Sequence, residues 1–82
     1  MNNYRKAEEK RIQNGLTKQD LEIIKLICYE KTSEQIATKL GKSVRTIEGS
    51  RLAIMKIIGA KSLVGIVMYG IRVGIVTVHV ES

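Results

Sequence analysis

The chain carries the signal for a helix start four times between residues 17 and 62, and it contains no proline. The starts are Thr17, Thr32, Ser43 and Ser62. Each has a side-chain oxygen that can accept a hydrogen bond from the first turn of a following helix. Between these starts, apolar residues recur three or four positions apart, which is the period of one helix face. The sequence therefore predicts an all-α fold of four helices.

The first two starts have the fuller signature of a capping box, in which two side chains bond reciprocally to the backbone of the first turn. Thr17 is followed by Asp20, and Thr32 is followed by Gln35, each at the required spacing of three residues. The helix after Thr17 is apolar over a stripe too broad for a surface helix. We therefore expect it at the centre of the bundle.

A short helix after Thr32 is closed by Gly41, and only Lys42 separates this glycine from the next start at Ser43. Glycine without a Cβ readily takes the left-handed turn that ends a helix. A short helix, a tight turn and a longer helix form the helix-turn-helix pattern. Residues at helical spacing are predicted to build the core: Leu21, Ile24, Ile27, Ile36, Leu40, Ile47, Ile54, Ile58 and Val67.

The pattern divides the chain into a basic extension over residues 1–15, a helical domain over 16–76 and a tail over 77–82. Residues 3–13 favour a loose helix. The run IVTVHV after Gly74 is rich in β-branched residues, so it fits either a short extended segment or a helix extension. Two origins stay open for a chain of this length: a stand-alone small regulator, or the excised output domain of a longer protein.

Several classes of protein are disfavoured by what the sequence lacks. No run of apolar residues is long enough to span a membrane, and charges occupy the place of a signal peptide's apolar region, so we expect a cytoplasmic location. The single cysteine, Cys28, lies in an apolar run, and the single histidine, His79, has no second histidine as a metal partner. The glycines form no phosphate-binding motif. We expect neither an enzyme nor a bound cofactor or metal.

Half of the net charge of +6 lies in one segment. Residues 43–61 hold four basic side chains against Glu48 alone, a net of +3, whereas residues 16–31 balance to zero. A local basic excess on a small domain attracts polyanions, of which nucleic acid is the commonest. The second helix of the predicted helix-turn-helix is therefore the candidate contact with nucleic acid.

An ordered set of residues resembles the LuxR-type (NarL/FixJ) helix-turn-helix domain. The set comprises LT at 16–17, Glu22 with Ile23 and Ile24, LI at 26–27, TSEQIATKL at 32–40, Ser43, TI at 46–47, Ile54, Lys56 and GAKSLVGIVMYGIRVGIV at 59–76. The resemblance implies a four-helix domain that binds double-stranded DNA through its third helix, over residues 43–58. It also implies dimerisation by the fourth helix and an origin as the output end of a response regulator, with RNA polymerase as a candidate further partner. Region 4 of sigma factors has a similar two-helix core, but it has no counterpart to residues 59–76.

With Ile47 and Ile54 facing inward, the opposite face of the third helix would meet DNA. The residues expected in this interface are Thr32, Ser33, Ser43, Arg45, Thr46, Glu48, Gly49, Ser50, Arg51, Leu52 and Lys56. Gly49 would allow close approach to the bases, Glu48 can accept from cytosine N4, and Leu52 can meet a thymine methyl group.

The basic and hydroxyl side chains of this set are expected at the DNA backbone. Arg45, Arg51 and Lys56 are placed as phosphate contacts, and the hydroxyls of Thr32, Ser33 and Thr46 are also expected near the DNA backbone. For Arg51 the sequence supports a second arrangement equally well, in which the aliphatic part of the side chain packs on the core and the guanidinium group lies in water.

The chain departs from the family pattern at several positions. The family often has glycine where this chain has Glu30, histidine at Ser50, asparagine at Ala53 and lysine at Glu48. The last three changes remove hydrogen-bond donors from the face that would meet DNA. A protein-interaction module on the same scaffold, without sequence-specific DNA readout, is therefore the alternative function.

The fourth helix has more apolar residues than a single inward stripe needs, namely Val64, Ile66, Val67, Met68 and Ile71, and this excess suggests a partner surface. The residues expected to form a homodimer contact are Val64, Val67, Met68 and Ile71.

Overall fold

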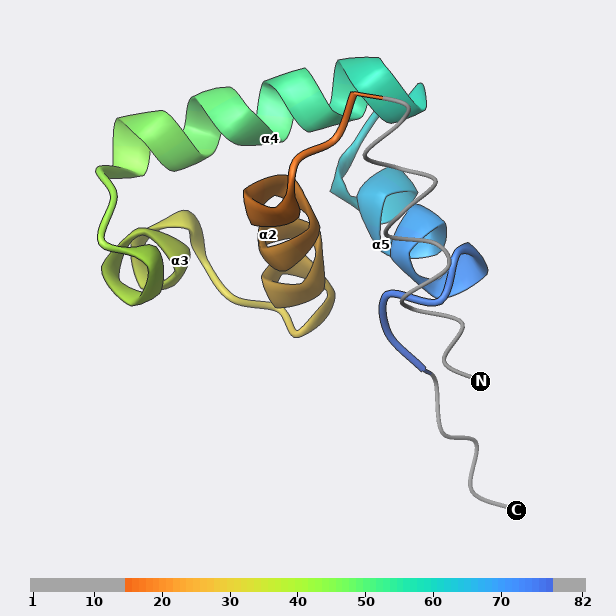
Figure 1. The fold of residues 1–82 in the computed structure, drawn as a ribbon, viewed down its shortest axis with the longest axis horizontal. Coiled ribbons are helices and arrows are strands. Elements are labelled where there is room, and N and C mark those ends of the chain that lie inside the picture. Colours follow the sequence, from red (N-terminus) through yellow and green to blue (C-terminus); the bar gives the residue numbers. More distant parts are fainter. Residues whose placement is uncertain (1–14, 78–82) are drawn as a thin grey trace.

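The computed structural model describes residues 15–77, which form four α-helices and no strand (Figure 1). The helices are α2 (Lys18–Cys28), α3 (Ser33–Leu40), α4 (Val44–Ile58) and α5 (Leu63–Arg72). The prediction of an all-α, four-helix fold with a helix-turn-helix is confirmed. The loose helix expected over residues 3–13, and His79 in the tail, lie outside the described residues.

Both predicted capping boxes are present. The Thr17 hydroxyl accepts from the Asp20 amide at 3.1 Å, and the Asp20 carboxylate accepts from the Thr17 amide at 2.9 Å. Thr32 and Gln35 make the same reciprocal pair at 3.1 and 2.9 Å. These bonds satisfy amide groups that have no partner within the helix, so they fix where α2 and α3 begin.

The turn that joins α3 to α4 is as short as predicted. Gly41 ends α3 in the left-handed conformation with φ of 66°, and the Ser43 hydroxyl accepts from the Thr46 amide at 3.0 Å to start α4. The fourth start is weaker than expected. Ser62 precedes α5, but its side chain makes no capping hydrogen bond.

The long helix α4 lies across one side of the molecule and packs against α2, α3 and α5 (Figure 1). α2 in turn packs against α4 and α5, and five of its residues are buried, as expected for a central helix. The buried apolar residues are Leu16, Leu21, Ile23, Ile24, Leu26, Ile27, Ile36, Ala37, Ile47, Ile54, Ile66 and Ile75. Leu40, Ile58 and Val67, also predicted in the core, are half-buried against it.

The rotation of α5 differs from the prediction. The sequence predicts Val67 in the core, but Ile66 is the residue that is fully buried, at 0% exposure, and Val67 is half-buried. The reason lies at Gly70, which is buried where α5 meets α2: a Cβ added there would stand 2.8 Å from Cys28 Sγ and 3.3 Å from Ile24 Cγ2. The absence of a side chain at Gly70 lets α5 approach α2 closely and turns Ile66 inward.

The loop between α2 and α3 contains Glu30, the one non-glycine residue between 15 and 77 with a positive φ, at 62°. Side chains with a Cβ rarely take this left-handed conformation. The resemblance to the LuxR-type pattern indicated glycine at this position, and the backbone conformation gives the physical reason.

None of the four helices is by itself long and apolar enough to cross a membrane. α4 and α5 taken together meet a test of length and composition, with a bend of 61° between them.

Candidate nucleic-acid interface

The helix α4 has a buried face and an exposed face. Ile47 and Ile54 are fully buried, as the spacing predicted. The exposed residues along the rest of the helix include Arg45, Thr46, Glu48, Gly49, Leu52, Ala53 and Lys56, and Ser50 and Arg51 are half-buried at the flanks. The residues predicted to face a partner are thus brought to one side of α4, away from the core.

The centre of this exposed face is bare. A Cβ added at Gly49 would have no neighbouring atom within 4 Å, so the helix backbone is open to solvent there. Leu52, one turn further along, is 68% exposed, so its side chain is open to a partner. Backbone and methyl groups therefore dominate the middle of the face.

Two cations border this bare centre. Arg45 and Lys56 are both exposed, and within residues 15–77 neither forms an ion pair. An unpaired surface cation keeps its full charge for an approaching anion. Their placement near the two ends of α4 suits contact with phosphates on either side of a groove.

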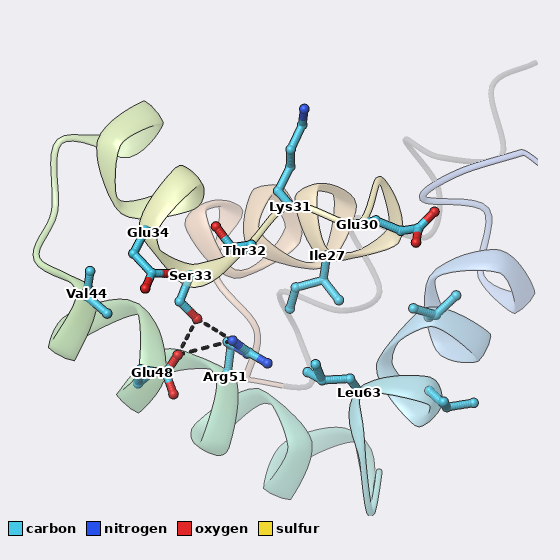
Figure 2. Close-up of a pocket in the computed structure, with 12 residues that line it drawn as sticks. Ile27, Glu30, Lys31, Thr32, Ser33, Glu34, Val44, Glu48, Arg51 and Leu63 are labelled. Carbon is cyan, nitrogen blue, oxygen red and sulfur yellow. Dashed lines mark hydrogen bonds and ion pairs between the residues drawn. The ribbon is translucent and has the colours of Figure 1, made fainter.

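The side chains of Ser33, Glu48 and Arg51 form a network between α3 and α4 (Figure 2). Arg51 Nη1 donates to Ser33 Oγ and lies 3.1 Å from Glu48 Oε2, and Ser33 Oγ donates to the same carboxylate oxygen. The Arg51 side chain is 20% exposed, so its head is neither free in water nor extended away from the domain. Two residues expected at phosphate, Ser33 and Arg51, are thus engaged within the protein.

Three other predicted hydroxyls lie at or near helix starts. Thr32 caps α3 and Ser43 caps α4, where Ser43 also donates to the Thr46 hydroxyl at 2.9 Å. All three side chains are exposed. The first turn of a helix presents unpaired amide groups and the positive end of the helix dipole, which favours a nearby phosphate.

A groove of about 610 Å³ lies beside this network (Figure 2). Apolar walls from α2, α4 and α5 are formed by Ile27, Val44 and Leu63, and carboxylates of Glu30 and Glu34 also line it. Sequence reasoning did not identify this groove, because its walls come from separate helices whose packing no local pattern specifies.

The described residues offer little for catalysis. Burial raises the pKa of the Cys28 thiol above its ordinary value, so this group is protonated at neutral pH and is a poor nucleophile. Within residues 15–77, no three histidine, cysteine, aspartate or glutamate side chains are grouped so that they could hold a metal ion. The geometry of the site is suited to binding.

A short helix, a tight turn and a longer helix with an exposed, basic outer face define a helix-turn-helix DNA-binding domain. Residues 14–70 match the family of bacterial regulatory proteins, luxR family, and the chain belongs to this family. It is therefore a DNA-binding domain of transcription regulation, and the resemblance seen in the sequence is confirmed. The family is regulatory, not enzymatic.

The chain is also similar to a response regulatory protein of Escherichia coli (strain K12), the uncharacterized protein YgeK. The two are 37% identical over 65 residues, which cover 79% of this chain and 44% of the relative. The match thus spans less than half the length of that relative. No solved structure matches the chain.

Proposed function

We propose that the chain is a sequence-specific regulator that binds double-stranded DNA with α4 in the major groove. The observation that carries the proposal is the outer face of α4, where the bare backbone at Gly49 lies between two unpaired cations, Arg45 and Lys56. The major groove of B-DNA is wide enough to admit an α-helix. The similarity to a response regulatory protein supports a role as the output domain of such a regulator, with RNA polymerase as a candidate partner.

Each residue of the face has a role in this proposal. Gly49 permits close approach of the helix to the base edges, and Leu52 contacts a thymine methyl group. Arg45, Lys56 and Thr46 bind phosphates, which set the register of the helix without reading sequence. Thr32 and Ser43 lie beside the sugar-phosphate backbone of the DNA, and Ser50 borders the outer face of α4. Glu48 accepts a hydrogen bond from cytosine N4.

We further propose that two copies associate through α5. Val64, Met68 and Ile71 are spaced four and three residues apart, so they lie on one stripe, and they are 68%, 57% and 38% exposed. An apolar stripe left in water favours a partner surface. Val67 is half-buried against the core and lies between this stripe and the body of the domain. A dimer would place two α4 helices on two half-sites.

The test of DNA reading by α4 is the substitution Gly49→Glu. Because residue 49 is exposed and its surroundings are open, the fold should tolerate the change, with a melting temperature equal to or slightly above that of the wild type. A bulky anion at the closest point of approach should nevertheless abolish binding to DNA selected from a random pool. Gly49→Ala is the matched control, and it should alter affinity only modestly.

If Gly49→Glu bound DNA as well as the wild type, α4 would not read the groove. The leading function would then be a protein-interaction module on the same scaffold. The exposed Leu52 and the few hydrogen-bond donors on the outer face are the features that would serve such a module.

A further inference from the structure

The network of Ser33, Glu48 and Arg51 leaves one carboxylate oxygen of Glu48 open. Both hydrogen bonds to the carboxylate end on Oε2, and within residues 15–77 Oε1 has no partner (Figure 2). Ser33 is 4% exposed and Arg51 is half-buried, whereas the Glu48 side chain is 55% exposed. The two supporting residues are thus held in the body of the domain, and the group that they support is the most exposed of the three.

This arrangement restricts Glu48. A solvent-exposed glutamate ordinarily samples many rotamers, and ordering it on binding costs free energy. Hydrogen bonds that involve a charged group are stronger than neutral ones, and two of them to one oxygen favour a single rotamer. Arg51 also offsets the repulsion that an unpaired carboxylate would feel from DNA phosphates. The network therefore prepares an acceptor at a defined place on the outer side of α4.

We propose, given that α4 enters the major groove as argued above, that Ser33 and Arg51 are positioning residues that hold Glu48 Oε1 for one cytosine in the binding site. Cytosine presents the N4 amino group, a donor, to the major groove, whereas guanine and thymine present acceptors that repel a carboxylate. Adenine has a donor beside an acceptor, so it suits a carboxylate less well. In this proposal Ser33 and Arg51 act within the protein and do not contact phosphate.

The base pair that faces Glu48 can be found by selecting DNA from a random pool with the wild type and with Glu48→Ala. One position should lose its preference for cytosine in the variant. Titration of duplexes that differ only at that pair should show a preference of roughly tenfold for cytosine over guanine or thymine in the wild type. The preference should vanish in Glu48→Ala.

Two variants that keep the net charge then test the positioning role. Ser33→Ala removes the hydroxyl of the network. Arg51→Lys keeps the cation but replaces the planar guanidinium, whose Nη1 donates to both Ser33 and Glu48, by an ammonium on a flexible stem. Each should lower the cytosine preference at that pair to about threefold or less, because the carboxylate is then less ordered. The preference at other positions and the salt dependence of binding should stay unchanged. In the Glu48→Ala background neither change should affect discrimination further.

Melting curves establish that each variant is folded, and if Ser33→Ala fails to fold, Arg51→Lys decides. The inference is overturned if folded variants keep the full cytosine preference, or if they lose affinity equally for all duplexes, as phosphate contacts would. The inference also fails, while the proposed function stands, if the wild type binds DNA sequence-specifically but Glu48→Ala changes the base preference at no position. If the wild type shows no salt-dependent binding to any duplex, the proposed function fails, and the positioning role fails with it.

Discussion

At the scale of single residues, Glu30 is held in a backbone conformation that its side chain disfavours. The left-handed region costs an L-residue about 1–2 kcal/mol, and glycine avoids this cost. Part of the gain is lost because glycine is more flexible in the unfolded chain. We expect Glu30→Gly to stabilise the domain by about 0.5–1 kcal/mol, a rise of several degrees in melting temperature for a chain of this size.

The matched control is Glu30→Gln, which removes the same charge and keeps the Cβ. It should melt close to the wild type. Equal shifts in both variants, measured by thermal denaturation, would attribute the effect to charge and contradict the conformational explanation.

At the scale of helices, Gly49 and Gly70 both lie within a helix, yet they should respond oppositely to alanine. Gly49→Ala should stabilise by up to about 1 kcal/mol, because alanine is the better helix former and the site is open. Gly70→Ala should destabilise by about 1–3 kcal/mol, because the new methyl group would meet the Cys28 sulfur at 2.8 Å between α5 and α2. Urea titration of both variants measures the free energy of unfolding, which should rise for Gly49→Ala and fall for Gly70→Ala.

Removing the Cys28 sulfur should restore part of the stability that Gly70→Ala loses. In a Cys28→Ala background, Gly70→Ala should cost less, since the sulfur that crowds residue 70 is gone. A cost that is equal in both backgrounds would show that the Cys28 sulfur does not limit the substitution.

A second prediction at the scale of helices concerns the exposed apolar stripe on α5, formed by Val64, Met68 and Ile71. Met68→Glu should leave the domain folded, because Met68 is 57% exposed, and it should sediment as a monomer. Met68→Leu, which keeps an apolar side chain of similar volume, should still dimerise. A wild type that is already monomeric at high concentration and on DNA would contradict the dimer.

At the scale of the whole molecule, the uneven charge predicts how binding depends on salt. Affinity for any duplex should fall steeply as salt rises, because each phosphate contact releases counterions. Arg45→Ala and Lys56→Ala should each weaken binding to all duplexes alike and reduce the salt slope by about one. Arg72→Ala, which removes an exposed cation at the end of α5, should leave the slope unchanged. A loss confined to one DNA sequence would contradict a phosphate role for Arg45 or Lys56.

The helices, their starts and the outer face of α4 were determined by the sequence alone. Capping bonds such as that between Thr17 and Asp20 join residues three apart, so the local sequence was enough to predict them. At Ser62, where no such bond forms, the sequence still indicated where the helix starts. The inward side of α4 followed from Ile47, Ile54 and Ile58, because their spacing of seven and four residues places them on one stripe of the helix. The candidate interface could be predicted to the extent that it follows from this single helix.

Only the tertiary structure decided which way α5 turns and what surrounds Glu48. α5 is apolar on most sides, so periodicity could not choose between Ile66 and Val67 as the buried residue. The contact of Gly70 with Cys28, 42 residues earlier in the chain, made the choice. Ser33 and Arg51 are likewise 18 residues apart, and they meet because α3 packs against α4 across the short turn at Gly41. Such contacts depend on how helices cross, and a local sequence pattern carries no information about that crossing.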